Sequence, residues 1–179
     1  MKKFTMTAAL AASLLTLSAC DGGAGSNNET AQTDESATLA DAVKGTTFAS
    51  AADAAGLQEL LGGPGPYTIL MPTDDAFAAL PAGTMDRLMS DEGRVDLGNI
   101  LTSHILPGEI GSEDIGNAID AGGGSIELPT YGAAVLTATR EGDAIILSDE
   151  SGHRATISSA DQRTKNGVIH RIDGVLATN

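Results

Sequence analysis

The sequence predicts an α+β fold in which helices come first along the chain and strands follow. The first half is rich in Ala and Leu, with apolar residues at helical spacing and glycines where helices would end. The second half consists of short apolar or alternating stretches separated by Gly, Asp and Glu, which is typical of strands and turns. Because the chain has no Trp, three Phe and two Tyr, its core must be mainly aliphatic. We therefore expect one domain with a largely antiparallel or mixed sheet.

The N-terminal residues predict an exported lipoprotein. Lys2 and Lys3 precede an apolar run that is too short to span a bilayer comfortably. The end of this run, Leu-Ser-Ala-Cys at 17–20, resembles the bacterial lipobox, in which the signal peptide is cleaved before a cysteine that then carries a lipid. We expect residues 1–19 to be the signal peptide and Cys20 to be lipidated. A plain signal peptide is the alternative, but it leaves the chain's one cysteine without a role.

The next segment, residues 20–37, predicts a flexible tether between the lipid and a domain over 38–179. After Cys20 it carries no large apolar residue and is rich in Gly, Ser, Asn and Thr, so it cannot bury enough surface to order itself. The lipid would attach the protein to a membrane of the cell envelope, facing the periplasm or the exterior. Asp21 resembles the inner-membrane retention signal of enteric bacteria, which favours the inner membrane.

The charge of the chain excludes one class of partner. The formal net charge is −14, and without Lys2 and Lys3 the mature chain keeps 8 basic against 24 acidic residues, a net charge of −16. Such a chain repels nucleic acid and anionic lipid headgroups, so we expect no nucleic-acid partner. Two explanations stay open, a well-solvated acidic surface and a specific cationic ligand.

Helices are expected over 37–45, 48–63 and 94–106. The last of these places Leu97, Ile100, Leu101 and His104 on one apolar face. Between the second and third, residues 66–72 are a short apolar run bounded by prolines, which predicts a strand. A short helix is expected after it, with Thr73 or Asp74 as its N-cap and Pro81 at its end.

Strands are expected in five stretches, at residues 125–130, 132–140, 143–148, 153–158 and 167–176. The Gly run at 121–125 lacks the spacing of a phosphate-binding loop and predicts a turn. In the last stretch, alternation places His170 on one face with Val168 and Ile172.

The sequence does not contain a recognisable reaction centre. It has no G-x-S-x-G motif, and His104, His153 and His170 lie far apart without zinc-type spacing. A metal bound by His104 and His170 would have an incomplete ligand set, so we expect no metal and no cofactor. His153 is expected at the surface beside a turn. We interpret His104 and His170 as buried, neutral, hydrogen-bonded residues that hold a helix to a strand.

Three stretches together resemble the fasciclin (FAS1) domain family. They are GPYTILMPTDDAFAALP (65–81), LTSHILPG (101–108) and NGVIHRIDGVL (166–176), which resemble the family's first box, central tyrosine-histidine box and second box in the family's order. The matching positions are Thr73, Asp75, Ala76 and Phe77 in the first, His104 and Gly108 in the central, and Asn166, Gly167, His170, Asp173 and Gly174 in the second.

The resemblance implies helices packed on a wedge of two β-sheets, a role in adhesion or protein interaction, and no general catalytic activity. Most matching residues are expected to serve the fold. Three positions depart from the family: Asp74 replaces an asparagine, Ser103 replaces a tyrosine, and Gln162 follows Asp161 where some animal members carry the Asp-Ile pair implicated in integrin binding. Integrin recognition is therefore not expected here.

The function expected from the sequence is that of a membrane-anchored, extracytoplasmic protein that mediates protein interaction or adhesion through an unidentified protein partner. The alternative is a periplasmic protein that binds a small ligand or a metal ion through Asp74, Asp75, Asp161 and Asp173. Helix capping and turns explain these acids more simply. A hydrolase is disfavoured because no nucleophile and base can be identified.

Overall fold

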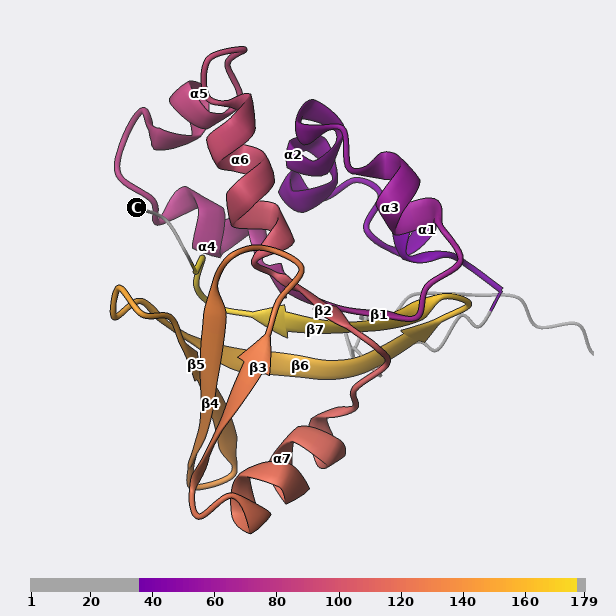
Figure 1. Cartoon of the computed structure of the whole chain (residues 1–179). Coiled ribbons are helices and arrows are strands. Elements are labelled where there is room, and N and C mark those ends of the chain that lie inside the picture. The colour runs from indigo at the N-terminus through magenta and orange to yellow at the C-terminus, as the bar shows by residue number, and fades with distance from the viewer. Residues whose placement is uncertain (1–35, 177–179) are drawn as a thin grey trace, which may run out of the picture.

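The computed structural model describes residues 36–176, so the predicted signal peptide, Cys20, Asp21 and most of the predicted tether lie outside the described residues. The helices are α1 (Leu39–Ala42), α2 (Thr47–Ala55), α3 (Gln58–Gly62), α4 (Asp74–Ala78), α5 (Thr84–Leu88), α6 (Arg94–Thr102) and α7 (Ser112–Ala121). The strands are β1 (Tyr67–Pro72), β2 (Ile105–Pro107), β3 (Ser125–Pro129), β4 (Val135–Glu141), β5 (Ala144–Ser148), β6 (Arg154–Thr164) and β7 (Gly167–Ile172) (Figure 1). Within 36–176, no helix is long and apolar enough to cross a membrane.

The strands form one mixed sheet in the order β2-β1-β7-β6-β5-β4-β3. β1 and β7 are parallel, and the other neighbouring strands are antiparallel. The sheet folds at β6, whose first residues pair with β5 while the rest pairs with β7. The pairing of β6 with β7 is interrupted between Ile157 and Ser159 and again between Ser159 and Gln162. The change of partner from β5 to β7 falls between Thr156 and Ile157 and separates the two halves of the expected wedge, and the bulges bend β6 just after this point.

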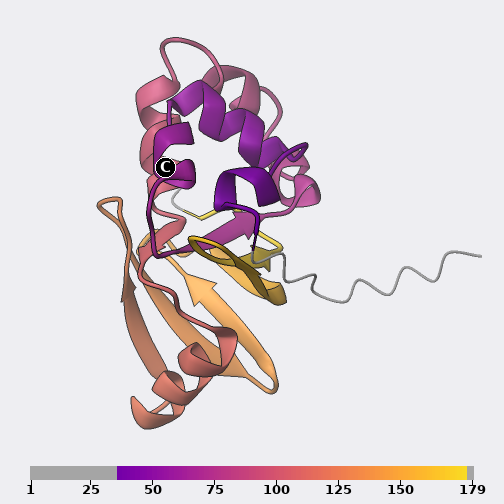
Figure 2. The same cartoon turned by 90° about the vertical axis from the view of Figure 1, so that its right-hand side faces the viewer.

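Two hydrophobic clusters lie on opposite faces of β1 and β7. Ile69 and Ile169 belong to the first cluster, which the helices α1–α6 cover. Leu70 and Ile172 belong to the second, which fills the wedge against α7 and β3–β5. Figure 2 shows α1–α6 gathered at one end of the molecule and α7 at the other. The α+β fold expected from the sequence is confirmed, and the central strands are buried on both faces.

Several expected element boundaries are wrong for local reasons. The segment 48–63 is two helices, because Gly56 adopts a left-handed φ of 76° and ends α2. The helix expected over 94–106 ends at Thr102. The chain then turns so that Ile105 of β2 pairs with Ile69 of β1. His104 therefore follows α6 and does not lie on its apolar face. The helices α5 and α7 were not expected.

Candidate functional site

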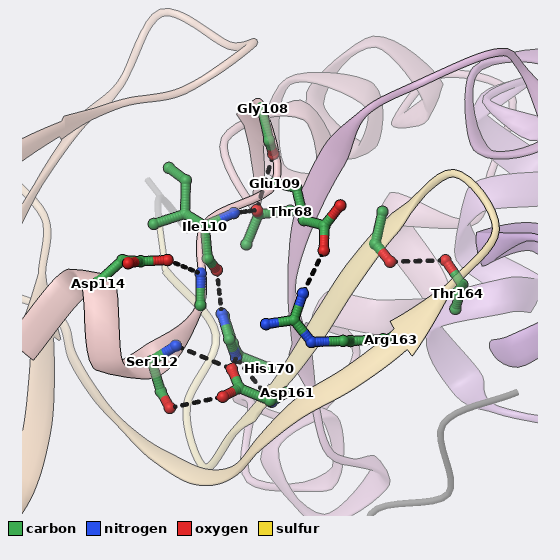
Figure 3. Close-up of polar contacts among 12 residues, drawn as sticks. Thr68, Gly108, Glu109, Ile110, Ser112, Asp114, Asp161, Arg163, Thr164 and His170 are labelled. Atoms are coloured by element: carbon green, nitrogen blue, oxygen red, sulfur yellow. Dashed lines mark hydrogen bonds and ion pairs between the residues drawn. The ribbon is translucent and has the colours of Figure 1, made fainter. Parts of the chain in front are cut away.

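His170 of β7 is fully buried and bonds to two backbone groups, as Figure 3 shows. Its Nε2 lies 2.8 Å from the carbonyl oxygen of Ile110, and its Nδ1 lies 3.2 Å from the backbone nitrogen of Asp161. A carbonyl accepts and an amide donates, so Nε2 carries the proton and Nδ1 is the acceptor. Burial lowers the pKa of His170, which keeps the ring neutral. The predicted buried, neutral role is supported, but the ring joins β7 to β6 and to the loop before α7, and not to a helix as expected.

Asp161 lies on β6 beside His170 and supports the start of α7 (Figure 3). Its Oδ1 accepts from the backbone nitrogen of Ser112 at 2.8 Å, and its Oδ2 accepts from the hydroxyl of Ser112 at 3.0 Å. Ser112 is the first residue of α7, whose free N–H groups need acceptors. The backbone of Asp161 has a φ of 60°, a conformation that Asp and Asn tolerate better than most residues. Its carboxylate is thus used as a helix cap.

His104 is also fully buried, but its proton lies on the other ring nitrogen. Nδ1 is 2.8 Å from the carbonyl oxygen of Ile100 in α6, and Nε2 accepts from the backbone nitrogen of Leu176 at 3.1 Å. Burial lowers the pKa of His104 to about 4, so the ring is neutral at pH 7. It joins the end of α6 to the chain after β7.

Asn166, in the turn before β7, ties the N-terminal helices to the sheet. Its Oδ1 accepts from the backbone nitrogen of Leu39 at 2.7 Å. Its Nδ2 donates to the carbonyl oxygens of Leu61 and Gly63 at 2.9 Å and 2.8 Å. The next residue is Gly167, where a Cβ would lie 2.0 Å from the carbonyl oxygen of Tyr67. These two motif residues therefore serve the packing of α1 and β1 against β7.

The first-box residues build α4 and its contact with the helical core. Thr73 is the N-cap, and its hydroxyl accepts from the backbone nitrogen of Ala76 at 3.2 Å. Ala76 and Phe77 are buried in the first cluster, and Asp75 lies in the first turn of the helix. Asp74 accepts from the backbone nitrogen of Thr47 at 2.8 Å, and its hydrogen bonds with Thr47 lower its pKa.

The remaining motif residues stabilise turns and strand ends. Asp173 accepts from the backbone nitrogen of Thr156 at 2.5 Å, which holds the chain after β7 against β6. Gly174 follows, where a Cβ would lie 2.8 Å from the carbonyl oxygen of Arg154. Gly108 has a φ of 92°, and its carbonyl accepts from the hydroxyl of Thr68 at 2.8 Å.

The structure does not bring the four acids proposed as ligands together. Asp161 caps α7, Asp74 bonds to the start of α2, Asp75 lies in the first turn of α4, and Asp173 bonds to β6. In the described residues there is no group of three or more His, Cys, Asp or Glu side chains that could hold a metal ion. The two buried histidines bond to different parts of the backbone.

One paired histidine was missed from the sequence. His153 was expected at the surface, but its ring Nδ1 lies 2.8 Å from Oδ2 of Asp149, whose side chain is only 3% exposed. The backbone nitrogen of His153 also donates to Oδ1 of Asp149 at 2.8 Å. His153 itself is half-buried, with 39% of its side chain exposed. The sequence did contain a signal for this pair, because Glu-Ser-Gly at 150–152 is a turn sequence that brings Asp149 and His153 together.

A comparison with known protein families identifies the family to which these motifs belong. The model of the fasciclin domain matches residues 44–178 of this chain. The chain belongs to the fasciclin family. Protein sll1483 from Synechocystis sp. is 36% identical over 151 residues, which cover 82% of this chain and 76% of that protein. Fasciclin relatives also include human periostin, which is 33% identical over 131 residues.

The solved structure of a FAS1 domain pair from the insect cell adhesion molecule fasciclin I has the same fold. The match has a TM-score of 0.57 and 25% sequence identity, and it covers 72% of this chain and 43% of that chain. The match to periostin covers 73% of this chain but only 14% of periostin. The fasciclin fold is therefore shared, while these larger proteins contain much more than this domain. Fasciclin-domain proteins are often involved in adhesion or protein interaction.

Proposed function

We propose that the chain is a membrane-anchored, extracytoplasmic fasciclin protein that mediates protein interaction or cell adhesion and has no catalytic activity. The observation that carries this proposal is that the buried motif side chains bond to the protein's own backbone. His104, Asn166 and His170 are buried and bond to the protein's own backbone, so they support the fold. Recognition of a partner therefore falls to exposed surface, where large apolar side chains include Val95 and Tyr131.

The anchor rests on the sequence of the N-terminal segment. We propose that Cys20 is lipidated after residues 1–19 are removed, and that Asp21 favours retention at the inner membrane. Metabolic labelling with an alkyne fatty acid tests this in the native host. The wild type should be labelled and sediment with membranes, whereas Cys20→Ser should lose both the label and the membrane association. A Cys20→Ser protein that remains labelled would overturn the anchor.

The partner is tested by photocrosslinking in cells that express the lipoprotein. A photoreactive amino acid is placed at Val95, whose exposure is 72%, or at Tyr131, whose exposure is 49%, and adducts are identified by mass spectrometry. The matched control carries the same group at Glu59, an exposed polar residue of α3. We expect a reproducible protein adduct at Val95 or Tyr131 that is absent at Glu59. Identical adduct patterns at all three positions would contradict a specific interaction surface.

The alternative function, binding of a small ligand or metal ion, loses its original motivation. The described structure gives Asp74, Asp161 and Asp173 separate backbone partners. Native mass spectrometry of the purified protein tests the acids directly, because a stoichiometric ion that disappears in Asp161→Asn or Asp173→Asn would revive this alternative.

A further inference from the structure

A cavity of about 510 Å³ lies between the helices α4–α6 and the chain that surrounds the start of β6 and the end of β7. Its apolar lining includes Ala76, Leu80, Leu88, Ile100 and Val175. Most of these residues belong to the first hydrophobic cluster, so the cavity opens onto the helical core. Small-molecule sites are typically about 300–1,000 Å³ and mainly apolar, with a few polar groups that orient the ligand.

Two arginines line this mainly apolar cavity, although the protein as a whole is acidic. Arg87, His153 and Arg154 line it together with one acid, Asp173, although the chain has 24 acidic and only 10 Lys and Arg residues. The carboxylate of Asp173 already accepts the amide of Thr156. Arg87, His153 and Arg154 each pair with an acid, so an anionic ligand is favoured by the donor geometry of the two guanidinium groups and not by a net positive charge.

Both arginines can turn toward a ligand at small cost. Arg87 pairs with Asp96 at 3.2 Å, and both side chains are more than half exposed. Arg154 pairs with Glu141, and both of those side chains are more than half exposed as well. Exposed ion pairs contribute only about 0–1 kcal/mol, so a carboxylate in the cavity can compete for either guanidinium.

His153 is held more firmly. The buried carboxylate of Asp149 accepts from both its backbone nitrogen and its ring Nδ1, each at 2.8 Å. Leaving a buried carboxylate without hydrogen-bond donors costs free energy, so the hydrogen bonds between Asp149 and His153 are strongly favoured. The imidazole at the cavity wall thus has a fixed position before any ligand binds, which is what a specific site requires.

We propose that this cavity binds a small organic carboxylate with an apolar body. The carboxylate lies at the guanidinium groups of Arg87 and Arg154, which provide paired donors, and His153 forms part of the cavity wall. The apolar body of the ligand packs against the apolar lining residues, which include Leu88, Ile100 and Val175. This site is independent of the proposed adhesion surface, because Val95 and Tyr131 do not line the cavity.

The first experiment is an NMR titration of the purified protein with octanoate. We expect saturable shifts of the amide signals of Arg87, His153, Arg154 and Val175. Two ligands of equal chain length, 1-octanol and octyltrimethylammonium, separate charge from apolar contact. Both should bind at least about tenfold more weakly than octanoate if the carboxylate is bound by the basic groups. Equal affinity for octanol, shifts located elsewhere, or no binding of octanoate would each overturn the proposal.

Substitutions of exposed side chains test the same site in proteins that should still fold. Arg87→Gln with Arg154→Gln should weaken octanoate binding about tenfold or more and leave octanol unaffected. Arg94→Gln is the matched control, since Arg94 is an exposed arginine of α6 that does not line the cavity. Ala79→Leu narrows the cavity and should weaken octanoate and octanol alike. Wild-type octanoate affinity in the double arginine variant would contradict the assignment.

Discussion

Leu39 and Asn166 are 127 residues apart and are joined by a 2.7 Å hydrogen bond from the backbone nitrogen of Leu39 to Oδ1 of Asn166. Lys165, next to Asn166, donates its backbone N–H to the carbonyl of Ala37 at 2.8 Å. The start of the domain is thus attached to the turn between β6 and β7. Ala37, the last residue of the predicted tether, already lies against this turn.

We predict that Asn166→Ala lowers the free energy of unfolding by about 3–5 kcal/mol. The change removes three hydrogen bonds and leaves the amide of Leu39 and the carbonyls of Leu61 and Gly63 without this partner. Asn166→Asp keeps the acceptor but loses both donors, so it should also destabilise. Asn99→Asp, on an exposed position of α6, is the control. Urea unfolding with hydrogen exchange at Leu39 measures the effect, and normal protection of Leu39 in Asn166→Ala would contradict it.

Two glycines should respond in opposite directions to the same substitution. Gly167→Ala places a Cβ 2.0 Å from the carbonyl oxygen of Tyr67, the residue that pairs with Gly167 in the parallel β1–β7 ladder. We expect a loss of about 2–4 kcal/mol in the free energy of unfolding. Gly98→Ala in α6 meets no atom within 4 Å and should raise it by about 0.5–1 kcal/mol. Thermal unfolding of both variants tests the pair, and a stable Gly167→Ala protein would refute the packing argument.

Asp161 should tolerate asparagine but not alanine. Asn keeps an oxygen for the amide of Ser112 and accepts a φ of 60°, so Asp161→Asn should cost less than about 1 kcal/mol. Asp161→Ala loses the cap of α7 and strains the backbone, so it should cost about 2–3 kcal/mol. Unfolding curves give the totals, and hydrogen exchange in α7 shows where stability is lost. Equal stability of the two variants would exclude a capping role.

The sequence predicted properties that depend on neighbours along the chain. Alternation in β7 and the motif pattern were enough to expect that His170 is buried and neutral. Its partners were not predictable, because Ile110 and Asp161 reach it only through the placement of α7 and the bulges of β6. The helix α7 escaped notice because Ile115 and Ile119 are its only large apolar residues among polar neighbours.

The cavity was unpredictable for a similar reason. It is lined by residues from α4, α5 and α6, from the start of β6 and from the chain after β7, which only the folded sheet brings together. The Arg87 and Arg154 side chains carry no local pattern that distinguishes them from other surface arginines. By contrast, a helix cap at Thr73 or Asp74 was expected, and Thr73 is the one used, because a hydroxyl just before an acidic first turn is a local signal.

The two buried histidines should make the protein lose stability in mild acid. Burial lowers the pKa of His104 from 6.5 to about 4, and burial also lowers the pKa of His170. The unfolded chain therefore takes up protons at a higher pH than the folded chain, and protonation favours unfolding. For His104 the contribution is complete above about pH 6.5 and is lost as the pH falls toward 4, a change of about 3 kcal/mol.

Carboxylates also titrate in this range, so the effect of His104 must be isolated by a difference. At pH 7.5, His104→Gln, His104→Ala and His170→Ala should each unfold at lower urea concentration than the wild type, because each disturbs two hydrogen bonds to the backbone. The gap between wild type and His104→Gln should then shrink between pH 6.5 and pH 4.5, since only the unfolded wild type takes up a proton at position 104 in this range. A gap that stays constant over this range would show that the pKa of His104 is not depressed in the folded protein.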